Sequence, residues 1–383
     1  MLKHENLVIL FKMMAGIIRK NTLIIQDMKK LILFLVLLAS ITACQNDPIT
    51  FEDYDYSSVY FPYQYPIRTI TLGEDLFDNT LDLQHKCNIM AALSGVYDNK
   101  KDVTIDVVVA DSLPNRFNFV FSPQQSNPVR AIRPMPRNYY TLASNQIVIK
   151  KGTISGGVEV QLTDAYFNDP LSLDANYVIP LMMTTVVNAD TILQGKPLNP
   201  GTRPRRLRAN QWDVLSKDYV LYAVKYINTW HGYYLRRGKD IVTGAVNSTI
   251  VRRPKDVQTY DSGITSASQW LVQLNSTSLK ALKFPVVLKD AAKVDYTCNL
   301  NITFDDNGNC AITSSDPATF TATGSGKFVK KGEKNSFGGL DRDVLYLDYT
   351  INHPGKGITT QTKDTLLMRN RGVVKETFNV VAQ

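Results

Sequence analysis

Short apolar runs that alternate with polar residues recur along most of this chain. In 103–111 and 158–162 nearly every second residue is Val, Ile or Leu, and Thr, Asp, Glu or Gln stand between them. Alternation with period two indicates a half-buried β-strand. On this basis strands are expected at 103–111, 146–150, 158–162 and 176–184, and the last is expected to be an edge or bulged strand because it contains Pro180. Short strands without a convincing helical period predict a β-sandwich over 58–196.

The second half of the chain has the same character. Strands are expected at 218–227, 231–237, 242–252, 270–274, 295–304, 310–314, 320–330, 344–351, 359–368 and 373–381. Gly, Asn and Pro at the breaks indicate short turns. An antiparallel meander of this length removes its edges by closing on itself, so we predict a β-barrel over 212–383. The Pro- and Arg-rich segment 197–211 has no periodicity and is expected to be a linker. The predicted fold class is therefore all-β.

The first 44 residues carry a different signal. Lys29 and Lys30 precede an apolar run at 31–39, and small residues lead to Cys44. The run is shorter than the about 20 residues that a spanning helix needs, and a core helix would not need these flanks. The pattern predicts a secretory signal with a lipidation site at Cys44. The expected parts are a non-native extension at 1–27, a lipoprotein signal peptide at 28–43 and an acidic tether at 44–57.

Charge divides the chain as well. The net charge is +8, but the sandwich half is acidic after the signal and the barrel half is basic. Such asymmetry supports two domains. The basic half could meet acidic glycans or lipid head groups, or its charge could simply be solvated surface. Nucleic acid is not expected as a partner of an exported chain with scattered lysines.

Little in the sequence indicates chemistry. The mature chain has three well-separated histidines and no Cys-x2-Cys, so no metal and no cofactor are expected. Asp305-Asp306-Asn307-Gly308 lacks the ligand spacing of a calcium loop and is interpreted as a hairpin turn. If Asn307 and Gly308 form a two-residue turn, Cys298 and Cys310 lie too far apart for a disulfide. No nucleophile motif occurs, and we expect no enzyme, although paired carboxylates for glycoside hydrolysis leave no sequence signature.

Aromatic residues are the best candidates for binding. Sugars present C–H faces to flat rings, so exposed Trp and Tyr side chains are expected in glycan sites. The candidates are Trp270, which follows a Gly/Ser/Thr-rich stretch, and the cluster Trp230, Tyr233, Tyr234 and Arg236. Neighbours in a strand face opposite sides, so only one of Tyr233 and Tyr234 is expected to be exposed if the other is in the core. Each of these aromatics could instead be a packing residue.

An ordered set of segments carries a family resemblance: 140–142, 149–156, 160–164, 177–181 and 190–196. Together they resemble the Ig-like N-terminal module of Bacteroidetes lipoproteins of unknown function. Segments 345–351 and 364–373 resemble the lipocalin-like C-terminal module of the same proteins, although the lipocalin glycine two residues before Trp230 is replaced by Asn228. Acidic residues after Cys44 are similar to export signals of such lipoproteins.

The resemblance implies an outer-membrane lipoprotein facing the cell exterior, encoded beside SusC-like and SusD-like partners and capturing polysaccharide. It supplies no catalytic residues. Two alternatives remain: a structural or adhesion lipoprotein that binds a protein, and a glycoside hydrolase without a recognisable motif. A planar row of exposed aromatics would favour glycan capture, a flat apolar patch would favour adhesion, and two close carboxylates in a cleft would favour hydrolysis.

Overall fold

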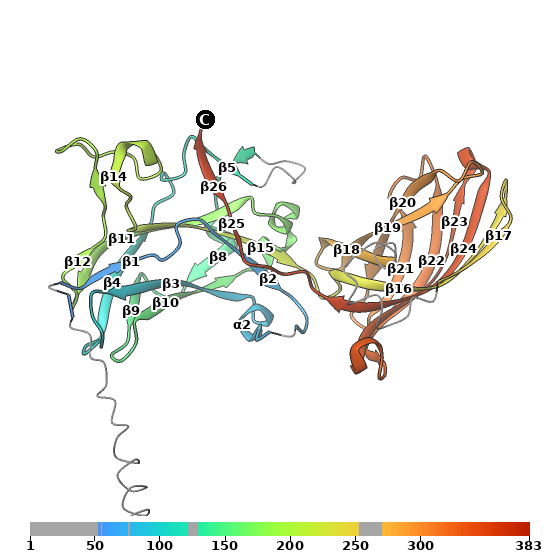
Figure 1. Cartoon of the computed structure of the whole chain (residues 1–383), viewed down its shortest axis with the longest axis horizontal. Helices are drawn as coiled ribbons and strands as arrows, with labels where there is room; N and C mark the ends of the chain where they lie inside the picture. The colour runs from blue at the N-terminus through green and yellow to red at the C-terminus, as the bar shows by residue number, and fades with distance from the viewer. Residues whose placement is uncertain (1–52, 55, 76, 122–128, 253–269) are drawn as a thin grey trace, which may run out of the picture. The chain divides into compact units, whose positions relative to one another are not determined.

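The computed structural model describes residues 53–383 apart from 55, 76, 122–128 and 253–269. The predicted lipidation site Cys44 and its signal lie outside the described residues. The structure is almost entirely β (Figure 1), which confirms the predicted fold class. The described helices are short and none is long and apolar enough to cross a membrane. They are α2 (Thr80–Leu83), α3 (Asp164–Asn168) and the 3-10 turns η1 (Arg137–Tyr139), η2 (Pro170–Leu173), η3 (Ala209–Gln211), η5 (Phe337–Gly339) and η6 (Pro354–Lys356).

Two sheets form the predicted sandwich. The first has the order β12-β1-β3-β10-β8, and the second has the order β25-β2-β15-β11-β4-β9, with β7 beside β11. Alternate residues of both sheets, such as Ile89 and Val160 in one and Ile105 and Ile179 in the other, fill a common core. The strands of the first sheet are β1 (Ser58–Tyr60), β3 (Lys86–Ser94), β8 (Tyr140–Leu142), β10 (Ser155–Leu162) and β12 (Thr191–Ile192). Those of the second are β2 (Pro66–Thr71), β4 (Val103–Val109), β7 (Arg133–Pro134), β9 (Gln146–Ile149), β11 (Tyr177–Val187), β15 (Tyr219–Ile227) and β25 (Glu376–Thr377).

The second sheet is covered on its other face too. A small sheet of β5 (Phe117–Val120), β6 (Val129–Ala131) and β26 (Asn379–Ala382) lies there, and Phe119 and Phe378 pack with Leu221 in a second core. Burial on both faces explains why β11 and β15 are nearly continuous apolar runs. The expectation that Pro180 marks an edge strand is wrong: β11 lies between β15 and β4, with Pro180 opposite Leu221. The expected irregularity is present, as a bulge between Met183 and Thr185.

The junction between the two halves differs from the sequence-based expectation. Strand β15 was expected to open the barrel, but it pairs antiparallel with β11 and parallel with β2. Segment 197–211, expected to be a linker, is packed: β13 (Lys196–Pro197) pairs with β14 (Trp212–Val214), and Arg206 forms an ion pair with the buried Asp218. The last segment, expected as a barrel strand at 373–381, instead returns to the sandwich as β25 and β26.

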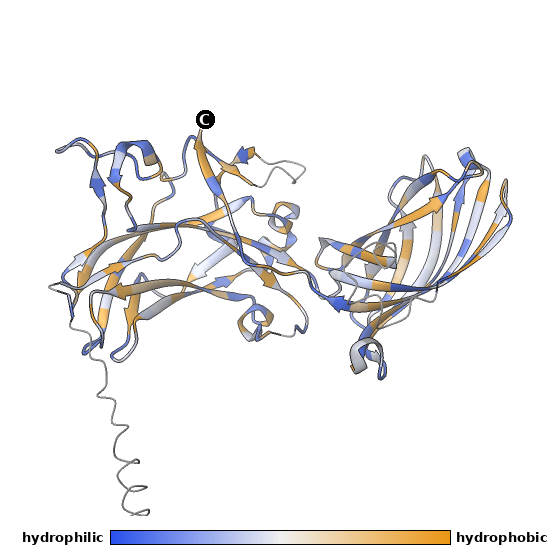
Figure 2. Cartoon of the chain, viewed as in Figure 1, coloured by the Kyte–Doolittle hydropathy of each residue, from blue (hydrophilic) through white to orange (hydrophobic). Residues whose placement is uncertain are grey.

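The barrel is a ring of eight described strands, closed where β16 pairs with β24. Apolar and polar residues alternate along its strands (Figure 2). Strand β19 was not anticipated, although its positions Leu282, Phe284, Val286 and Leu288 are buried; Lys283 and Pro285 stand between them. The ring strands are β16 (Gly232–Gly244), β18 (Leu271–Ser278), β19 (Ala281–Lys289), β20 (Asp295–Phe304), β21 (Asn309–Ser314), β22 (Thr321–Glu333), β23 (Arg342–His353) and β24 (Ile358–Asn370). A ninth strand, β17 (Ser248–Arg252), pairs with β16 alone in the part of the chain that the structure describes.

Residues 305–308 form the turn of the β20–β21 hairpin, as predicted from the sequence. The carboxylate of Asp305 accepts hydrogen bonds from the backbone N–H groups of Asn307 and Asn309, and Gly308 adopts φ 77°. The register differs by one residue from that of a two-residue turn, because Phe304 rather than Asp305 faces Cys310. All three cysteines of the described residues, Cys87, Cys298 and Cys310, are buried and free.

A polar cluster ties the barrel strands to the loops that lead into them. The buried guanidinium of Arg371 donates to the backbone oxygens of Leu72 and His231 at 2.8 and 2.7 Å, and also to those of Glu74 and Asn228. The side chain of Asn228, fully buried, donates to the oxygens of two residues around the β18–β19 turn. Arg371 and Asn228 thus hold together segments that are almost 300 positions apart in sequence.

Candidate functional site

The barrel has a split in its wall. Strands β17 and β18 both pair with β16, so they follow one another along the same side of that strand. Strand β18 pairs with β19 only from Asn275 onward, opposite 281–283. Among the described residues, β17 has β16 as its one partner, and the later part of β19 pairs with β20 alone. The edges of β17 and β19 therefore flank an opening into the barrel interior.

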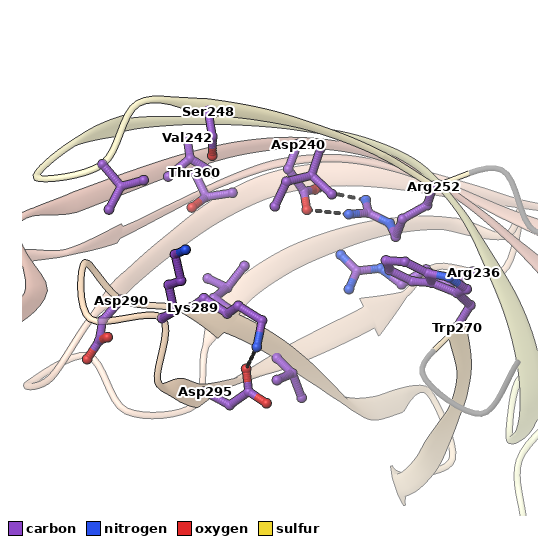
Figure 3. Close-up of a pocket in the computed structure, with 15 residues that line it drawn as sticks. Arg236, Asp240, Val242, Ser248, Arg252, Trp270, Lys289, Asp290, Asp295 and Thr360 are labelled. Carbon is purple, nitrogen blue, oxygen red and sulfur yellow. Dashed lines mark hydrogen bonds and ion pairs between the residues drawn. The ribbon is translucent and has the colours of Figure 1, made fainter. Parts of the chain in front are cut away.

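A pocket of about 460 Å³ lies at this split. Its size falls within the usual range for small-molecule sites, about 300–1,000 Å³. Figure 3 shows Asp240, Arg252 and Thr360 on one side of the pocket and Lys289, Asp290 and Asp295 on the other. The lining residues are Arg236, Asp240, Val242, Val246, Ser248, Ile250, Arg252, Trp270, Val287, Leu288, Lys289, Asp290, Lys293, Asp295 and Thr360.

One half of the pocket floor is formed by Arg236, which is held from behind by the carboxylate of Asp364, a residue outside the lining. This carboxylate is 3% exposed and accepts hydrogen bonds at Oδ2 from Arg236 Nε, at 2.9 Å, and from the hydroxyl of Tyr349, at 2.8 Å. Arg236 also donates from Nη2 to the Tyr349 oxygen at 3.0 Å, and its guanidinium lies over the ring of Phe284. All these side chains point inward because they occupy alternate positions of β16, β23, β24 and β19.

The other half is built around Arg252, the last residue of β17, which is 2% exposed. Its guanidinium donates to both oxygens of Asp240, from Nη2 at 2.8 Å to Oδ1, and from Nη2 to Asp364 Oδ1 at 2.6 Å. Thr362 adds a hydrogen bond to Asp240 Oδ1 at 2.8 Å. Two arginines and two aspartates thus form one buried ionic network, whose charges cancel. Such networks contribute little net stability compared with apolar packing, which makes a role in binding worth considering.

Burial and charge act in opposite directions on the network. Burial opposes the charge of Arg236, but Tyr349, Asp364 and Asp240 outweigh it and raise the pKa of the guanidinium. Burial raises the pKa of Tyr349 well above its ordinary value, so this residue stays a neutral hydroxyl donor. Arg236 therefore stays charged and Tyr349 stays neutral at any physiological pH.

Trp270 and four charged residues complete the pocket. The indole lies at the end where β18 begins, and Arg252 lies 5.8 Å from its ring centroid. At the rim, Lys289 pairs with Asp295 and Asp290 pairs with Lys356, at 2.6 and 3.0 Å. The site thus combines an aromatic face, buried charged donors and a polar rim.

The structure brings together only two of the sequence-predicted binding residues, Trp270 and Arg236. Tyr234 is fully buried in the barrel core, so it cannot stack on a ligand, whereas Tyr233 on the opposite face is partly exposed, as alternation predicted. The ring of Trp230 is stacked on Phe304 with centroids 4.0 Å apart and serves packing. The candidates therefore do not form a planar row, and the site is a pocket.

Sequence reasoning missed Asp240, Arg252 and Asp364. A weak signal exists: 360, 362 and 364 are polar on the inward face of β24, where a barrel core would be apolar. Their partners lie on distant strands, and Arg252 and Asp364 are 112 positions apart. No group of three or more metal-ligating side chains occurs within the described residues.

Comparison with known proteins places the chain in a family. Residues 229–372 match a domain of unknown function (DUF5627), and 54–190 match a model described as an N-terminal domain. A Bacteroides ovatus crystal structure of unknown function is 43% identical, with a TM-score of 0.77, and the match covers 87% of this chain and 100% of that one. This chain belongs to the same family. The family model over 229–372 contains all the pocket-lining residues, from Arg236 to Thr360, so the pocket lies within that domain.

More distant structures also come from Bacteroides. An auxiliary nutrient-binding protein of Bacteroides thetaiotaomicron is 13% identical, with a TM-score of 0.32 over 79% of this chain and 90% of that one. A candidate carbohydrate-binding protein of Bacteroides ovatus is 10% identical, with a TM-score of 0.23 over 85% and 97%. These scores are too low to bear on the function of this chain. No curated protein matches it.

Proposed function

We propose that this protein is a non-catalytic carbohydrate-binding lipoprotein of the outer membrane, and that its site is the pocket between β17 and β19. The observation that carries the proposal is Trp270, placed at a pocket of about 460 Å³ beside buried, fixed hydrogen-bond donors. A sugar needs a flat apolar face for its C–H groups and oriented polar groups for its hydroxyls, and this pocket offers both. The protein would serve a polysaccharide uptake system as an accessory to SusC-like and SusD-like partners.

Electrophoresis of the protein in gels cast with a panel of polysaccharides tests the binding. At least one glycan should retard the protein, and Trp270→Ala should abolish most of that retardation. Trp212→Ala is the matched control, because Trp212 lies in β14 of the sandwich and not in the pocket. Uniform mobility across a broad panel, or equal loss in both variants, would count against the proposal.

The membrane anchor has a separate test. Mass spectrometry of the native protein should find a diacyl or triacyl modification on Cys44 and no residue before it. An unmodified Cys44 with 28–43 still attached would contradict the anchor without touching the binding site.

Hydrolysis is a second candidate because two carboxylates, Asp240 in the pocket lining and Asp364 behind it, meet at the guanidinium of Arg252. A glycosidase needs one carboxyl group that gives up a proton and one that attacks or activates water. Here each of the four carboxylate oxygens accepts a hydrogen bond from a guanidinium. We therefore expect no release of reducing ends on prolonged incubation with any glycan that binds, and such release would favour the hydrolase.

A further inference from the structure

In the ionic network at the pocket floor, every carboxylate oxygen accepts a hydrogen bond, but some guanidinium N–H groups have no acceptor among the described residues. Oδ1 and Oδ2 of Asp364 and both oxygens of Asp240 are engaged by the arginines, with Tyr349 and Thr362 adding hydroxyl donors. A guanidinium carries five N–H donors and no acceptor. The two arginines therefore bring ten donors to a site in which each carboxylate oxygen already accepts at least one hydrogen bond.

Two nitrogens are left over. Arg252 Nε is buried and has no hydrogen-bond partner. Arg236 Nη1 donates to no side chain or backbone oxygen in the part of the chain that the structure describes, although Nε and Nη2 of the same group are both engaged. Both residues line the pocket and are at least nine-tenths buried, at 2% and 5% exposure. A buried donor without a partner costs free energy, so an acceptor entering the pocket would recover it.

The charged residues at the rim indicate that the acceptor is negatively charged. The lining contains four basic residues, Arg236, Arg252, Lys289 and Lys293, against the three acids Asp240, Asp290 and Asp295. Lys289 is paired with Asp295, and Asp290 is paired with Lys356 outside the lining. Lys293, held at φ 63° in the loop between β19 and β20, has no ion pair within the described ranges. The uncommitted charge of the pocket is therefore positive.

We infer that the ligand is an anionic glycan, whose carboxylate or sulfate group is received by the free N–H groups of Arg236 and Arg252 while the sugar ring lies on Trp270. This inference rests on the proposed function and names its substrate class. Arginine suits the role because its planar fork matches two oxygens of an oxyanion and its charge is fixed. A neutral sugar hydroxyl would satisfy one donor, but only an oxyanion offers several acceptors and balances Lys293.

Matched ligand pairs test the inference by calorimetry with the whole protein. The pairs are oligogalacturonate against its carboxyl-reduced form, and keratan sulfate, which has no uronic acid, against its desulfated form. The acidic member of one pair should bind at least about tenfold more tightly, as expected for charge-assisted hydrogen bonds, and the difference should shrink with added salt. The pair that shows the difference tells whether carboxylate or sulfate is recognised.

Single substitutions test whether the pocket residues cause the preference for the acidic ligand. Arg236→Gln should remove most of the preference for the acidic member, with thermal denaturation as a check on folding. If that variant does not fold, Lys293→Gln at the rim decides, with an expected loss of about threefold for the acidic ligand and none for the neutral one. Lys283→Gln is the matched control, because Lys283 is an exposed lysine of β19 outside the pocket lining.

Each outcome has a distinct meaning. Equal binding of acidic and neutral members overturns the inference and leaves carbohydrate binding standing. Acidic binding that Lys283→Gln weakens as much as Lys293→Gln also overturns it, since surface charge would then account for the preference. Binding of no glycan in either pair or in the polysaccharide panel defeats the proposed function itself.

Discussion

Replacing Arg371 with alanine should destabilise the protein far more than an ordinary surface substitution. Arg371 is 3% exposed and donates to four backbone oxygens, two from the loop after β2 and two from the loop before β16. Burial lowers the pKa of its guanidinium, which nevertheless remains charged.

The magnitude follows from the acceptors left behind. A buried carbonyl that loses its donor costs about 1–3 kcal/mol, and these losses are not additive when water can enter. Two of the four oxygens accept at 2.7 and 2.8 Å from a buried guanidinium, and Glu74 accepts at 3.2 Å near the surface. We therefore expect a loss of about 3–5 kcal/mol for Arg371→Ala. Arg371→Lys should recover part of it, since an ammonium has three donors.

Urea unfolding followed by far-UV circular dichroism measures the effect. Lys363→Ala is the control: Lys363 pairs with Asp348 but its side chain is 81% exposed, so a change below about 0.5 kcal/mol is expected. A loss for Arg371→Ala within about 1 kcal/mol of this control would refute the reasoning, because the four hydrogen bonds would then not hold the loops together.

Three further predictions concern pH, backbone geometry and thiol chemistry. Burial, with smaller effects of Arg371 and Lys225, lowers the pKa of His231 to about 4, so the unfolded chain binds the extra proton first as pH falls. Between about pH 6.5 and 4, the free energy of unfolding should fall by up to about 3 kcal/mol more in the wild type than in His231→Asn. Urea midpoints that shift equally with pH in the two proteins would contradict this. Gly238→Ala should lower the free energy of thermal unfolding by more than about 2 kcal/mol, because the added Cβ would lie 2.3 Å from Lys363 O and 2.6 Å from Asp364 Oδ1. Gly152→Ala is the control: no atom beyond its chain neighbours lies within 4 Å of the added Cβ, so it should cost only about 1 kcal/mol. Burial raises the pKa of the thiols of Cys87, Cys298 and Cys310 to about 11 or 12. Iodoacetamide should therefore label these three cysteines only after unfolding. Rapid labelling of the native protein would contradict this and show that the cores open.

Alternation of apolar and polar residues was enough to predict both halves of the fold but not all of its connections. A pattern shows which face of a strand is buried and not which strand lies beside it. Thus β15 was recognised as a strand, yet its partners β2 and β11 became clear only in the structure. Strand β19 was not predicted, although its buried residues alternate along the strand and Pro285 interrupts the pattern only once: Leu282, Phe284, Val286 and Leu288.

The residues of the pocket were harder to predict from the sequence than the strands. Trp270 and Arg236 were found because their residue types suggest binding wherever they occur. Asp240 and Asp364 look like ordinary strand carboxylates in the sequence, and their role depends on Arg252, which reaches them from β17, the strand paired with β16. Long-range ion pairs of this kind leave no local spacing for a reader of the sequence to detect.

The return of the chain from β24 to the sandwich has a consequence for biogenesis. Strand β26 pairs with β5, and Phe378 fits against Phe119 with ring centroids 4.7 Å apart, so residues made after the barrel complete a layer begun long before it. The first domain to leave the ribosome must therefore wait, with an apolar surface uncovered, until almost the whole polypeptide has been synthesised. A chaperone that shields Phe117, Phe119 and Leu221 during that interval would find the same surface buried once Phe378 has packed against it.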